Sequence, residues 1–231
     1  LSEGVDGEVF SENFASLNRN KRSLTINIKD AREASRLKDL CKAADVFIEN
    51  FRPGVLRKHG LGAVDLRAQN PRLVVCSISG YGQTGPDSSK GAFDVTVQAI
   101  SGLMSVTGDG DGPPAKAGVP VGDFAAGLYA AYSILAAVIR ARETGIGGVI
   151  DCSMLGSLIG ISALQTSEYF GTGQIPKRIG SAHPRNAPYQ GFVCKDGYLA
   201  VAAGNEKLWR AFCLVIELPE LLGDGRFITQ V

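Results

Sequence analysis

The sequence predicts an α/β protein in which a parallel sheet is flanked by helices, followed by the start of a smaller α+β domain. Short apolar strand patterns alternate with amphipathic helical patterns through the first half of the chain, an order that favours parallel strands joined by helices. Later, two strand patterns are separated by a turn at Lys195-Asp-Gly197, which is typical of a hairpin. We therefore expect an α/β domain over residues 1–164 and the start of a small domain over residues 165–231.

The first half of the chain contains three strand patterns. The last of them is uniformly apolar at its start, as buried parallel strands are. Strands are predicted at residues 23–28, 45–49 and 73–79. Helical segments are predicted at residues 30–43, 54–61 and 64–70. The alternation of the two sets predicts a sheet whose strands run in one direction.

The middle of the chain, residues 80–122, is rich in glycine and proline and contains one short helical pattern at residues 96–103. So long a stretch with little regular pattern is more typical of substrate contacts than of a core. Beyond it we expect an apolar helix at 124–139, a strand at 148–153, an apolar helix at 154–170, hairpin strands at 190–194 and 198–203, and a helix after Asn205.

Composition narrows the possible functions. With 24 Lys and Arg against 23 Asp and Glu, the net charge of +1 provides no field for nucleic acid or an anionic membrane. Five cysteines without a Cys-x-x-Cys pair argue for reduced thiols inside the cell, in the cytoplasm or the mitochondrial matrix. With only two histidines, no metal site is expected. The apolar run 124–139 is shorter than the roughly 18–20 residues of a membrane span and is expected to be a buried core helix.

Asp123 stands alone at the head of this apolar helix, in the segment Gly118-Val-Pro-Val-Gly-Asp123. Unpaired backbone N–H groups and the positive end of the helix dipole favour the ionised form of a carboxyl group at that position. An ionised carboxylate on a rigid support can act as a nucleophile. The alternative is an N-cap, since Asp is among the best capping residues, and local sequence alone favours this interpretation.

One motif is misleading. Gly80-Tyr-Gly-Gln-Thr-Gly85 matches the dinucleotide fingerprint G-x-G-x-x-G and follows a strand pattern. The fingerprint requires a helix to begin at once and an acidic residue about 20 positions later. Here the chain continues into the loop sequence Pro86-Asp-Ser-Ser-Lys-Gly91, so nicotinamide binding is not expected. The sequence has neither a G-x-S-x-G elbow nor a phosphate loop, which removes the main support for serine hydrolase and nucleoside triphosphatase functions.

Basic side chains gather where two predicted strands end. Lys29 follows the first strand, and Arg52 and Lys58 follow the second. Because the carboxyl ends of neighbouring parallel strands share one edge of a sheet, these cations are placed to converge on phosphate groups. Ile26 and Phe51 then offer apolar contact to a base. The alternative for each single cation is ordinary solvated surface charge.

Seven motifs in order resemble the family III CoA-transferases of the CaiB/BaiF type, the group that includes formyl-CoA transferase and carnitine CoA-transferase. The motifs are Asn18-Arg-Asn-Lys-Arg-Ser-Leu24, Glu49-Asn-Phe-Arg-Pro-Gly-Val55, Asn70-Pro-Arg-Leu-Val74, Ser77-Ile-Ser-Gly-Tyr-Gly-Gln-Thr-Gly-Pro86, Ser101-Gly-Leu-Met-Ser-Val-Thr-Gly108, Asp111-Gly-Pro-Pro114 and Gly118-Val-Pro-Val-Gly-Asp123. The similarity continues through Ala182-His-Pro184, Ala187-Pro-Tyr-Gln190 and Gly204-Asn205, so it covers nearly the whole chain.

The resemblance implies that Asp123 is the nucleophile, which reverses the preference for a simple N-cap. It implies transfer of CoA from an acyl-CoA donor to a small carboxylic or dicarboxylic acid, through an acyl-aspartyl anhydride and an aspartyl-CoA thioester. We expect the N–H groups of Phe124 and Ala125 to stabilise the oxyanions. CoA thioesters are then substrates, and no permanently bound cofactor or metal is implied. The positions that match the family's CoA site are Ile26, Lys29, Asn50, Phe51, Arg52 and Lys58.

The resemblance also implies how much of a subunit the chain represents. The family's opening strand–helix unit has no counterpart before Leu1, and its returning C-terminal segment has none after Val231. The first domain is thus expected to be a CoA-binding and catalytic domain that is incomplete at its N-terminus, in a protein that forms a homodimer when full length. The glycine run that closes the site of formyl-CoA transferase is matched by Pro184-Arg-Asn-Ala-Pro-Tyr-Gln190, which puts a mobile glycine lid in doubt.

Two alternatives stay open. The α-methylacyl-CoA racemases resemble this sequence but pair the aspartate with a histidine, where this chain has Phe93, and phenylalanine cannot accept a proton. The second alternative is a non-catalytic CoA-binding fragment. Burial of Asp123 against a core instead of a cleft would favour it.

Overall fold

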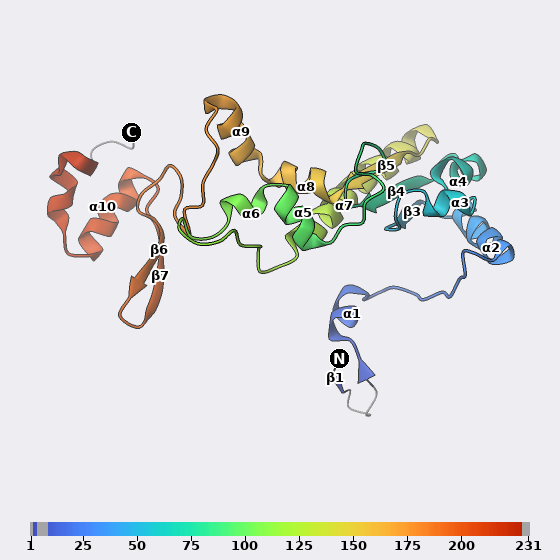
Figure 1. Ribbon diagram of the computed structural model, residues 1–231, viewed down its shortest axis with the longest axis horizontal. Helices are drawn as coiled ribbons and strands as arrows, with labels where there is room; N and C mark the ends of the chain where they lie inside the picture. The colour runs from blue at the N-terminus through green and yellow to red at the C-terminus, as the bar shows by residue number, and fades with distance from the viewer. Residues whose placement is uncertain (1, 4–8, 228–231) are drawn as a thin grey trace.

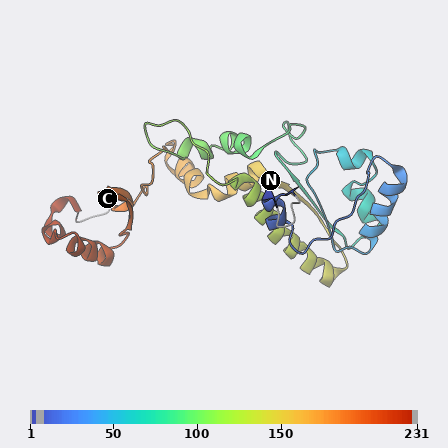
Figure 2. The ribbon, with the colours of Figure 1, turned by 90° about the horizontal axis from the view of Figure 1, so that it is seen from below.

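The structure, a computed structural model, describes residues 2–3 and 9–227 (Figure 1). It begins with a short antiparallel pair, β1 (Ser2–Glu3) and β2 (Val9–Phe10), followed by helix α1 (Glu12–Leu17). An irregular segment then leads into the central α/β body. A separate C-terminal unit lies at the opposite end of the molecule from helix α2, as Figures 1 and 2 both show.

The α/β body is built on a three-stranded parallel sheet. Its strands are β3 (Val46–Glu49), β4 (Val74–Ser79) and β5 (Val149–Ser153), in the order β3-β4-β5. The central strand is the most buried, because both of its edges are paired and both of its faces are covered. The predicted parallel α/β sheet is therefore confirmed, with strand positions within about one residue of the expected ones.

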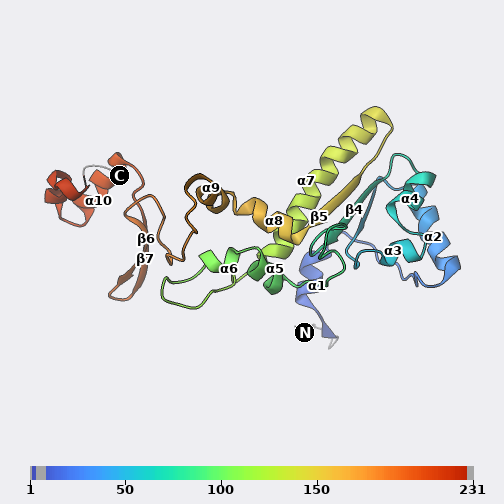
Figure 3. The ribbon, with the colours of Figure 1, turned by 45° about the horizontal axis from the view of Figure 1, so that its top comes forward.

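Helices cover the sheet on its two faces (Figure 3). One face carries α2 (Ala31–Lys42), α3 (Val55–Lys58) and α4 (Ala63–Gln69). The other carries α5 (Asp94–Ile100), α7 (Val121–Thr144) and α8 (Met154–Ile161). Neighbouring residues of β4 point to opposite faces, so Val75 joins the first core and Cys76 the second.

Local chemistry explains where the long helices begin and end. The Asp30 carboxylate caps α2 by accepting hydrogen bonds from the N–H groups of Arg32, at 2.8 Å, and Glu33, at 3.1 Å. Helix α7 ends at Gly145, which has a φ of 75° and donates its N–H to the Ala141 carbonyl. Glycine adopts this left-handed conformation without the steric cost that a Cβ atom brings.

The predicted strand at residues 23–28 is wrong, because residues 21–27 form no regular structure. An apolar alternation becomes a strand only where a neighbouring edge supplies hydrogen bonds, and within the described part of the chain no strand pairs with this segment. Leu24 is accordingly exposed, whereas Ile28 packs against the core beneath α2. Ile26 and Lys29 therefore lie in or beside an irregular segment and not at the end of a sheet strand.

Two predicted helices are divided. The apolar segment 154–170 forms α8 and then α9 (Ala163–Thr172), with a break at Ser162, whose hydroxyl donates to the Leu158 carbonyl. The short helix expected at 96–103 forms α5 and then α6 (Leu103–Val106), which are separated by Gly102 in a left-handed conformation. Apolar composition alone does not show where such a run changes direction.

The C-terminal unit contains the expected hairpin. Strands β6 (Tyr189–Cys194) and β7 (Gly197–Ala202) pair antiparallel and are followed by helix α10 (Glu206–Val215). Two 3-10 helices, η1 (Pro219–Gly223) and η2 (Gly225–Phe227), complete the unit. The proposed domain boundary at residue 165 falls within α9 and stays a prediction.

Helix α7 packs through one face only, which corrects the expectation of a fully buried core helix. Its small residues lie against β4 and α8, whereas a stripe of large apolar residues on its other face is more than half exposed. The stripe consists of Phe124, Leu128, Tyr132, Leu135 and Ile139. By length and composition alone this 24-residue helix could cross a membrane, but the core helix of a globular protein passes the same test.

Candidate functional site

Asp123 lines a cavity of about 610 Å³ at the carboxyl end of the sheet. The cavity is formed by the loop after β3 (residues 50–53), the end of β4 (residues 78–80), the segment 90–94 and the first two turns of α7. In parallel α/β sheets this edge is where ligands lie, because the loops that follow the strands converge there. The sequence thus brings these four segments, and Met154 at the start of α8, to one cavity.

Short contacts hold these segments together. The Asn50 side chain donates to the Ile78 carbonyl at 2.7 Å, which joins the loop after β3 to the end of β4. The Gly80 carbonyl accepts from the Leu155 N–H at 3.0 Å, which joins the end of β4 to α8. Gly80 also lies so close to Ala92 that an added Cβ would come within 2.2 Å of the Ala92 Cβ. Only glycine therefore fits between β4 and the segment that leads into α5.

Asp123 is the third residue of α7 and not its N-cap. The helix begins after Pro120, which has no capping side chain. The Asp123 carboxylate is exposed on the cavity side, with Ala126 and Gly127 on the next turn beside it. The N-cap alternative is therefore wrong. Burial of Asp123 against a core, which would have favoured a non-catalytic fragment, is not observed, because Asp123 lines a cavity.

The electrostatic surroundings of Asp123 differ from the sequence-based expectation. Partial burial raises the pKa of its carboxyl group, and the neighbouring Asp94 carboxylate raises it further. The helix N-terminus favours the ionised form, but the net direction of the shift is upward. A carboxylate of higher pKa is also a stronger nucleophile once it is ionised.

The expectation for the oxyanion donors is corrected at Phe124. Its N–H already donates to the Pro120 carbonyl within the first turn of α7, at 3.1 Å. The Gly122 N–H donates to the Asp94 carboxylate at 2.7 Å. Because the helix begins two residues before Asp123, N–H groups that the sequence placed at a free helix end are engaged.

Three of the predicted CoA contacts share the cavity with Asp123. They are Asn50, Phe51 and Arg52, and the aromatic ring of Phe51 is about half exposed. Their loop is shaped by the Phe51 N–H, which donates to the Glu49 carboxylate at 2.7 Å. The Arg52 guanidinium passes beside Gly91, where an added Cβ would lie 3.0 Å from one of its nitrogens. These residues form an open, cationic and aromatic wall of the cavity that Asp123 also lines.

The other three predicted CoA contacts, Ile26, Lys29 and Lys58, do not line this cavity. Lys29 and Lys58 are exposed, and Lys29 follows an irregular segment instead of a strand. Lys58 lies at the end of α3, where it is the preceding residue, Arg57, that faces a cavity. Neighbouring residues on a helix point about 100° apart, so a position chosen by strand proximity alone can miss the concave side.

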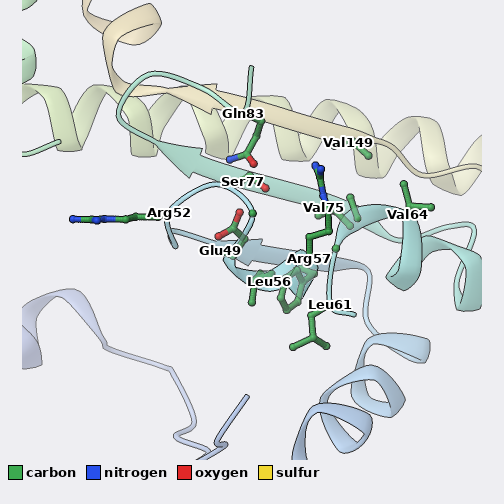
Figure 4. Close-up of a pocket in the computed structure, with 14 residues that line it drawn as sticks. Glu49, Arg52, Leu56, Arg57, Leu61, Val64, Val75, Ser77, Gln83 and Val149 are labelled. Carbon is green, nitrogen blue, oxygen red and sulfur yellow. The ribbon is translucent and has the colours of Figure 1, made fainter. Parts of the chain in front are cut away.

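A smaller cavity of about 270 Å³ lies on the α3 and α4 side of the sheet (Figure 4). In Figure 4 the Arg57 side chain rises toward Val75, while the Arg52 side chain extends away from these residues. Glu49 pairs in register with Ser77, and the Gln83 side chain lies above them. Arg52 lines both cavities and is therefore the cation that connects them.

The glycine-rich segment after β4 does not form the strand–turn–helix unit of a dinucleotide site. The Gly82 N–H donates to the Ser79 hydroxyl, and the Gln83 N–H donates to the Asp151 carboxylate at 2.8 Å. The chain then continues as turns, and the next helix begins at Asp94. The helix that the fingerprint needs directly after these glycines is not formed between Gly85 and Phe93, as the loop sequence indicated.

Sequence reasoning missed Asp94, which lines the cavity and influences Asp123 directly. It occupies the first position of α5, next to Phe93, the residue that separates this chain from the racemase pattern. Phe93 lines the cavity and is 80% exposed, so a side chain that cannot accept a proton occupies the position of the racemase histidine. The sequence signal that could have identified Asp94 is its place directly after Phe93, the position that matches the racemase histidine.

A third cavity, of about 1140 Å³, lies in the C-terminal unit. It is lined by the segment 183–188, which includes the Pro-rich sequence after Ala182, and by aromatic residues of α10 and η2. The His183 ring accepts backbone N–H groups of Arg185, at 3.2 Å, and Asn186, at 3.1 Å, through Nδ1. These bonds hold the segment 183–186 in a tight turn beside the cavity.

Comparison with known proteins shows to which family the sequence is similar. The family model of CoA-transferase family III matches residues 5–231. Succinyl-CoA:glutarate CoA-transferase of Mus musculus is 42% identical over 94% of this chain and 50% of its own length. Succinate–glutarate CoA-transferase of Agrobacterium fabrum is 40% identical over 99% of this chain and 57% of its own length.

A solved structure agrees with these relatives. The crystal structure of a CAIB/BAIF family protein from Brucella suis has a TM-score of 0.84 and 39% identity, and covers 97% of this chain and 60% of that one. The chain spans about half the length of the curated relatives it matches, 50% and 57% of them. Family match, sequence identity and fold agree with the motifs and the cavity, and the chain belongs to CoA-transferase family III.

Proposed function

We propose that the complete protein transfers CoA from an acyl-CoA donor to a free carboxylic acid, with Asp123 as the nucleophile. One observation carries the proposal: the Asp123 carboxylate is exposed in a cavity that Asn50, Phe51 and Arg52 also line. An anionic nucleophile thus shares one cavity with cationic and aromatic side chains of the kind that bind a nucleotide thioester.

CoA is proposed to lie along the wall formed by the loop after β3. Arg52 supplies a fixed positive charge for a phosphate, and Phe51 offers an apolar face to the ligand. Ile26, Lys29 and Lys58 remain proposed contacts on the strength of the family resemblance. Since these three lie outside the cavity, they are assigned to the end of the CoA molecule that is farther from the thioester.

The reaction is proposed to proceed by two kinds of covalent intermediate. The Asp123 carboxylate attacks the acyl carbonyl of the donor, the C–S bond breaks, and CoA leaves as a thiolate. The thiolate then attacks the aspartyl carbonyl of the resulting anhydride, which releases the first acid and leaves an aspartyl-CoA thioester. The acceptor carboxylate attacks this thioester, and the freed thiolate attacks the new anhydride, which gives the new acyl-CoA and restores Asp123.

Small dicarboxylic acids are the proposed acceptors, and succinyl-CoA the proposed donor. This assignment rests on the names of two relatives at about 40% identity, which both pair succinate or succinyl-CoA with glutarate. The reaction requires CoA thioesters as substrates and, as we propose it, no permanently bound cofactor or metal.

The complete protein is proposed to be a homodimer inside the cell, in the cytoplasm or the mitochondrial matrix. The exposed apolar stripe on α7 supports association, because a contiguous apolar surface of that length is unusual on a monomer. All five cysteines are free thiols, which suits a reducing compartment. Sedimentation of the complete protein tests the oligomeric state, and a monomer at micromolar concentration would contradict the dimer.

The function is tested by incubating the complete protein with succinyl-CoA and a panel of dicarboxylates and identifying new thioesters by mass spectrometry. We expect glutaryl-CoA to form with the wild type and not with Asp123→Asn. Exchange of the α-proton of a 2-methylacyl-CoA in deuterated water is measured in parallel. Deuterium incorporation without CoA transfer would contradict the proposal and favour the racemase alternative.

A further inference from the structure

Gln98 is a fully buried polar residue, with no exposed surface, on the inner side of α5. Both ends of its side-chain amide are used. Nε2 donates to Oδ2 of Asp94 at 2.6 Å, and Oε1 accepts from the backbone N–H of Ala117 at 2.8 Å. A carboxylate can only accept and a backbone N–H can only donate, so the two partners fix which way the amide points.

Asp94 continues this chain of hydrogen bonds. It lies one helical turn before Gln98, so the two side chains share a face of α5. While Oδ2 accepts from Gln98, Oδ1 accepts from the backbone N–H of Gly122 at 2.7 Å. The connected groups run from the Ala117 N–H through Gln98 and Asp94 to the Gly122 N–H.

This chain ties both ends of one short segment to α5. We name residues 117–122 the lead-in segment, because they connect the glycine- and proline-rich loop to Asp123. Residues 118–120 of this segment are exposed, whereas Val121 packs against the core and Gly122 is buried. The two backbone N–H groups that Gln98 and Asp94 bind fix the segment at both of its ends, and together with the packing of Val121 they set where it lies.

Packing at Gly122 shows how closely the segment is held. A Cβ added to Gly122 would lie 2.9 Å from Oδ1 of Asp94 and 3.5 Å from a methyl group of Leu158. Gly122 itself is buried, and the next residue is Asp123. A small displacement of the lead-in segment therefore moves the Asp123 carboxylate within its cavity.

We propose that Gln98 is a positioning residue for the CoA-transfer reaction: through Asp94 and the lead-in segment, it fixes where the Asp123 carboxylate stands in the cavity. We call the hydrogen-bonded chain from the Ala117 N–H through Gln98 and Asp94 to the Gly122 N–H the clamp. The expected effect of the clamp on rate rests on the proposed function, whereas its hydrogen bonds are observed in the structure. Displacements of about 1 Å at a reacting group can cost about 100-fold in rate, so a clamp of this kind acts on turnover more than on substrate binding.

The first test is Gln98→Leu, which keeps the side-chain size and removes both hydrogen bonds. In the complete protein we expect kcat to fall about 10- to 100-fold, while KM for succinyl-CoA changes less than about threefold. Hydrogen–deuterium exchange of residues 117–122 should rise in this variant. Wild-type kcat together with wild-type exchange in Gln98→Leu would overturn the proposal.

The matched control is Ser157→Ala. Ser157 is also a buried polar residue of the same core, and its hydroxyl donates to the Ser153 carbonyl at 2.9 Å without a bond to the lead-in segment. This variant should lower Tm but leave kcat and the exchange of residues 117–122 as in the wild type. If it reproduced the kcat loss of Gln98→Leu, the effect would be one of core stability and the proposal would fail.

The second test reverses the polarity of the pair and covers the case in which Gln98→Leu does not fold. In Asp94→Asn alone, the amide of Gln98 meets a second amide in place of the carboxylate that accepts its hydrogen bond. In Gln98→Glu alone, two carboxylates meet and neither can donate. The double variant restores one donor and one acceptor, because the amide introduced at position 94 can donate to the carboxylate introduced at position 98, while each still accepts its backbone N–H. We expect its kcat to exceed that of either single variant at least about fivefold, the sign of coupled residues. A double variant no better than the poorer single variant would contradict the clamp.

These outcomes separate the clamp from the proposed function. If the wild type transferred no CoA, the function would be wrong, and the clamp would still be decided by exchange of residues 117–122 in the wild type, Gln98→Leu and Ser157→Ala. If the wild type and Gln98→Leu transferred CoA equally fast, and hydrogen–deuterium exchange of residues 117–122 were the same in both, only the clamp would be wrong.

Discussion

The two walls of the Asp123 cavity are built differently. The wall formed by α5 and the start of α7 is closely tied, with Asp94 bonded to Gln98 and Gly122, and its fixed charge is negative. The wall formed by the loop after β3 is open: Phe51 and Arg52 are exposed, and among the described residues only Asn50 joins the loop to β4 by a side-chain hydrogen bond. A tight wall suits a group that must keep its position, whereas an open wall suits the binding of a large ligand.

The first prediction breaks the tight wall at its reacting group. Asp123→Asn should lower kcat at least about 1,000-fold, because an amide cannot form the proposed anhydride or thioester. Far-UV circular dichroism should be unchanged, since Asp123 is not the N-cap of α7. Initial rates of glutaryl-CoA formation check the loss. Substantial transfer by this variant would contradict the assignment of the nucleophile.

The second prediction breaks the open wall. Arg52→Ala should raise KM for succinyl-CoA about 10-fold, the equivalent of one charge-assisted hydrogen bond, with little change in kcat. The KM difference should shrink as salt rises, because the interaction is between charges near solvent. Arg36→Ala, an exposed arginine on α2 that lines neither cavity, is the control. A rise of KM for the free acid alone would show that Arg52 is misassigned.

The third prediction uses the negative charge of the tight wall. The Asp94 carboxylate raises the pKa of Asp123, and Asp123 must be ionised to attack. Removing that charge in Asp94→Asn lowers the pKa of Asp123, so the acidic limb of the kcat/KM profile should move to lower pH. The position of this limb is independent of any overall loss of rate. An unmoved limb would mean that another group controls it.

The fourth prediction concerns stability and is smaller. Because the folded-state pKa of Asp123 is raised, its contribution to stability is present below the unfolded value of about 3.8 and is lost as pH rises through the folded pKa. Asp123→Asn should therefore be slightly more stable than the wild type at pH 7 and no more stable at pH 3. Thermal unfolding at the two pH values measures the difference. A destabilised variant at pH 7 would contradict the direction of the shift.

The fifth prediction compares two neighbouring cations. Arg57 lines the smaller cavity, whereas Lys58 lines neither this cavity nor that of Asp123. Lys58→Ala should change KM for succinyl-CoA less than about threefold, as is usual for an exposed surface charge. Dephosphorylated CoA thioesters compared with the intact ones show whether Lys58 binds a phosphate. A large, phosphate-dependent rise of KM would show that Lys58 makes a strong phosphate contact and not the weak one expected at the exposed far end of CoA.

The sequence predicts the parallel sheet because the relevant signals are local. Residues 73–79 are uniformly apolar at their start, and helical periodicity frames them, so β4 and its neighbours follow from periodicity alone. The segment 23–28 carries the same kind of signal, yet forms no strand, because pairing depends on an edge elsewhere in the chain.

Some residues of the candidate site could likewise be predicted from the sequence, and others could not. Asp123 and the segment 50–52 were identified from position and motif, and the structure places them in one cavity. Asp94 and Gln98 were missed, because their partners are the backbone N–H groups of Ala117 and Gly122, which carry no sequence signal. Which side chain reaches a distant backbone group depends on tertiary packing.

A covalent bond to Asp123 is the central requirement of the proposed reaction. The complete protein is incubated with succinyl-CoA in the presence of hydroxylamine, and the peptide that contains Asp123 is analysed by mass spectrometry. We predict a hydroxamate at Asp123 that requires succinyl-CoA and is absent from Asp123→Asn, because hydroxylamine captures an activated aspartyl carbonyl. Continued CoA transfer with an unmodified Asp123, or a hydroxamate at another residue, would contradict the central claim.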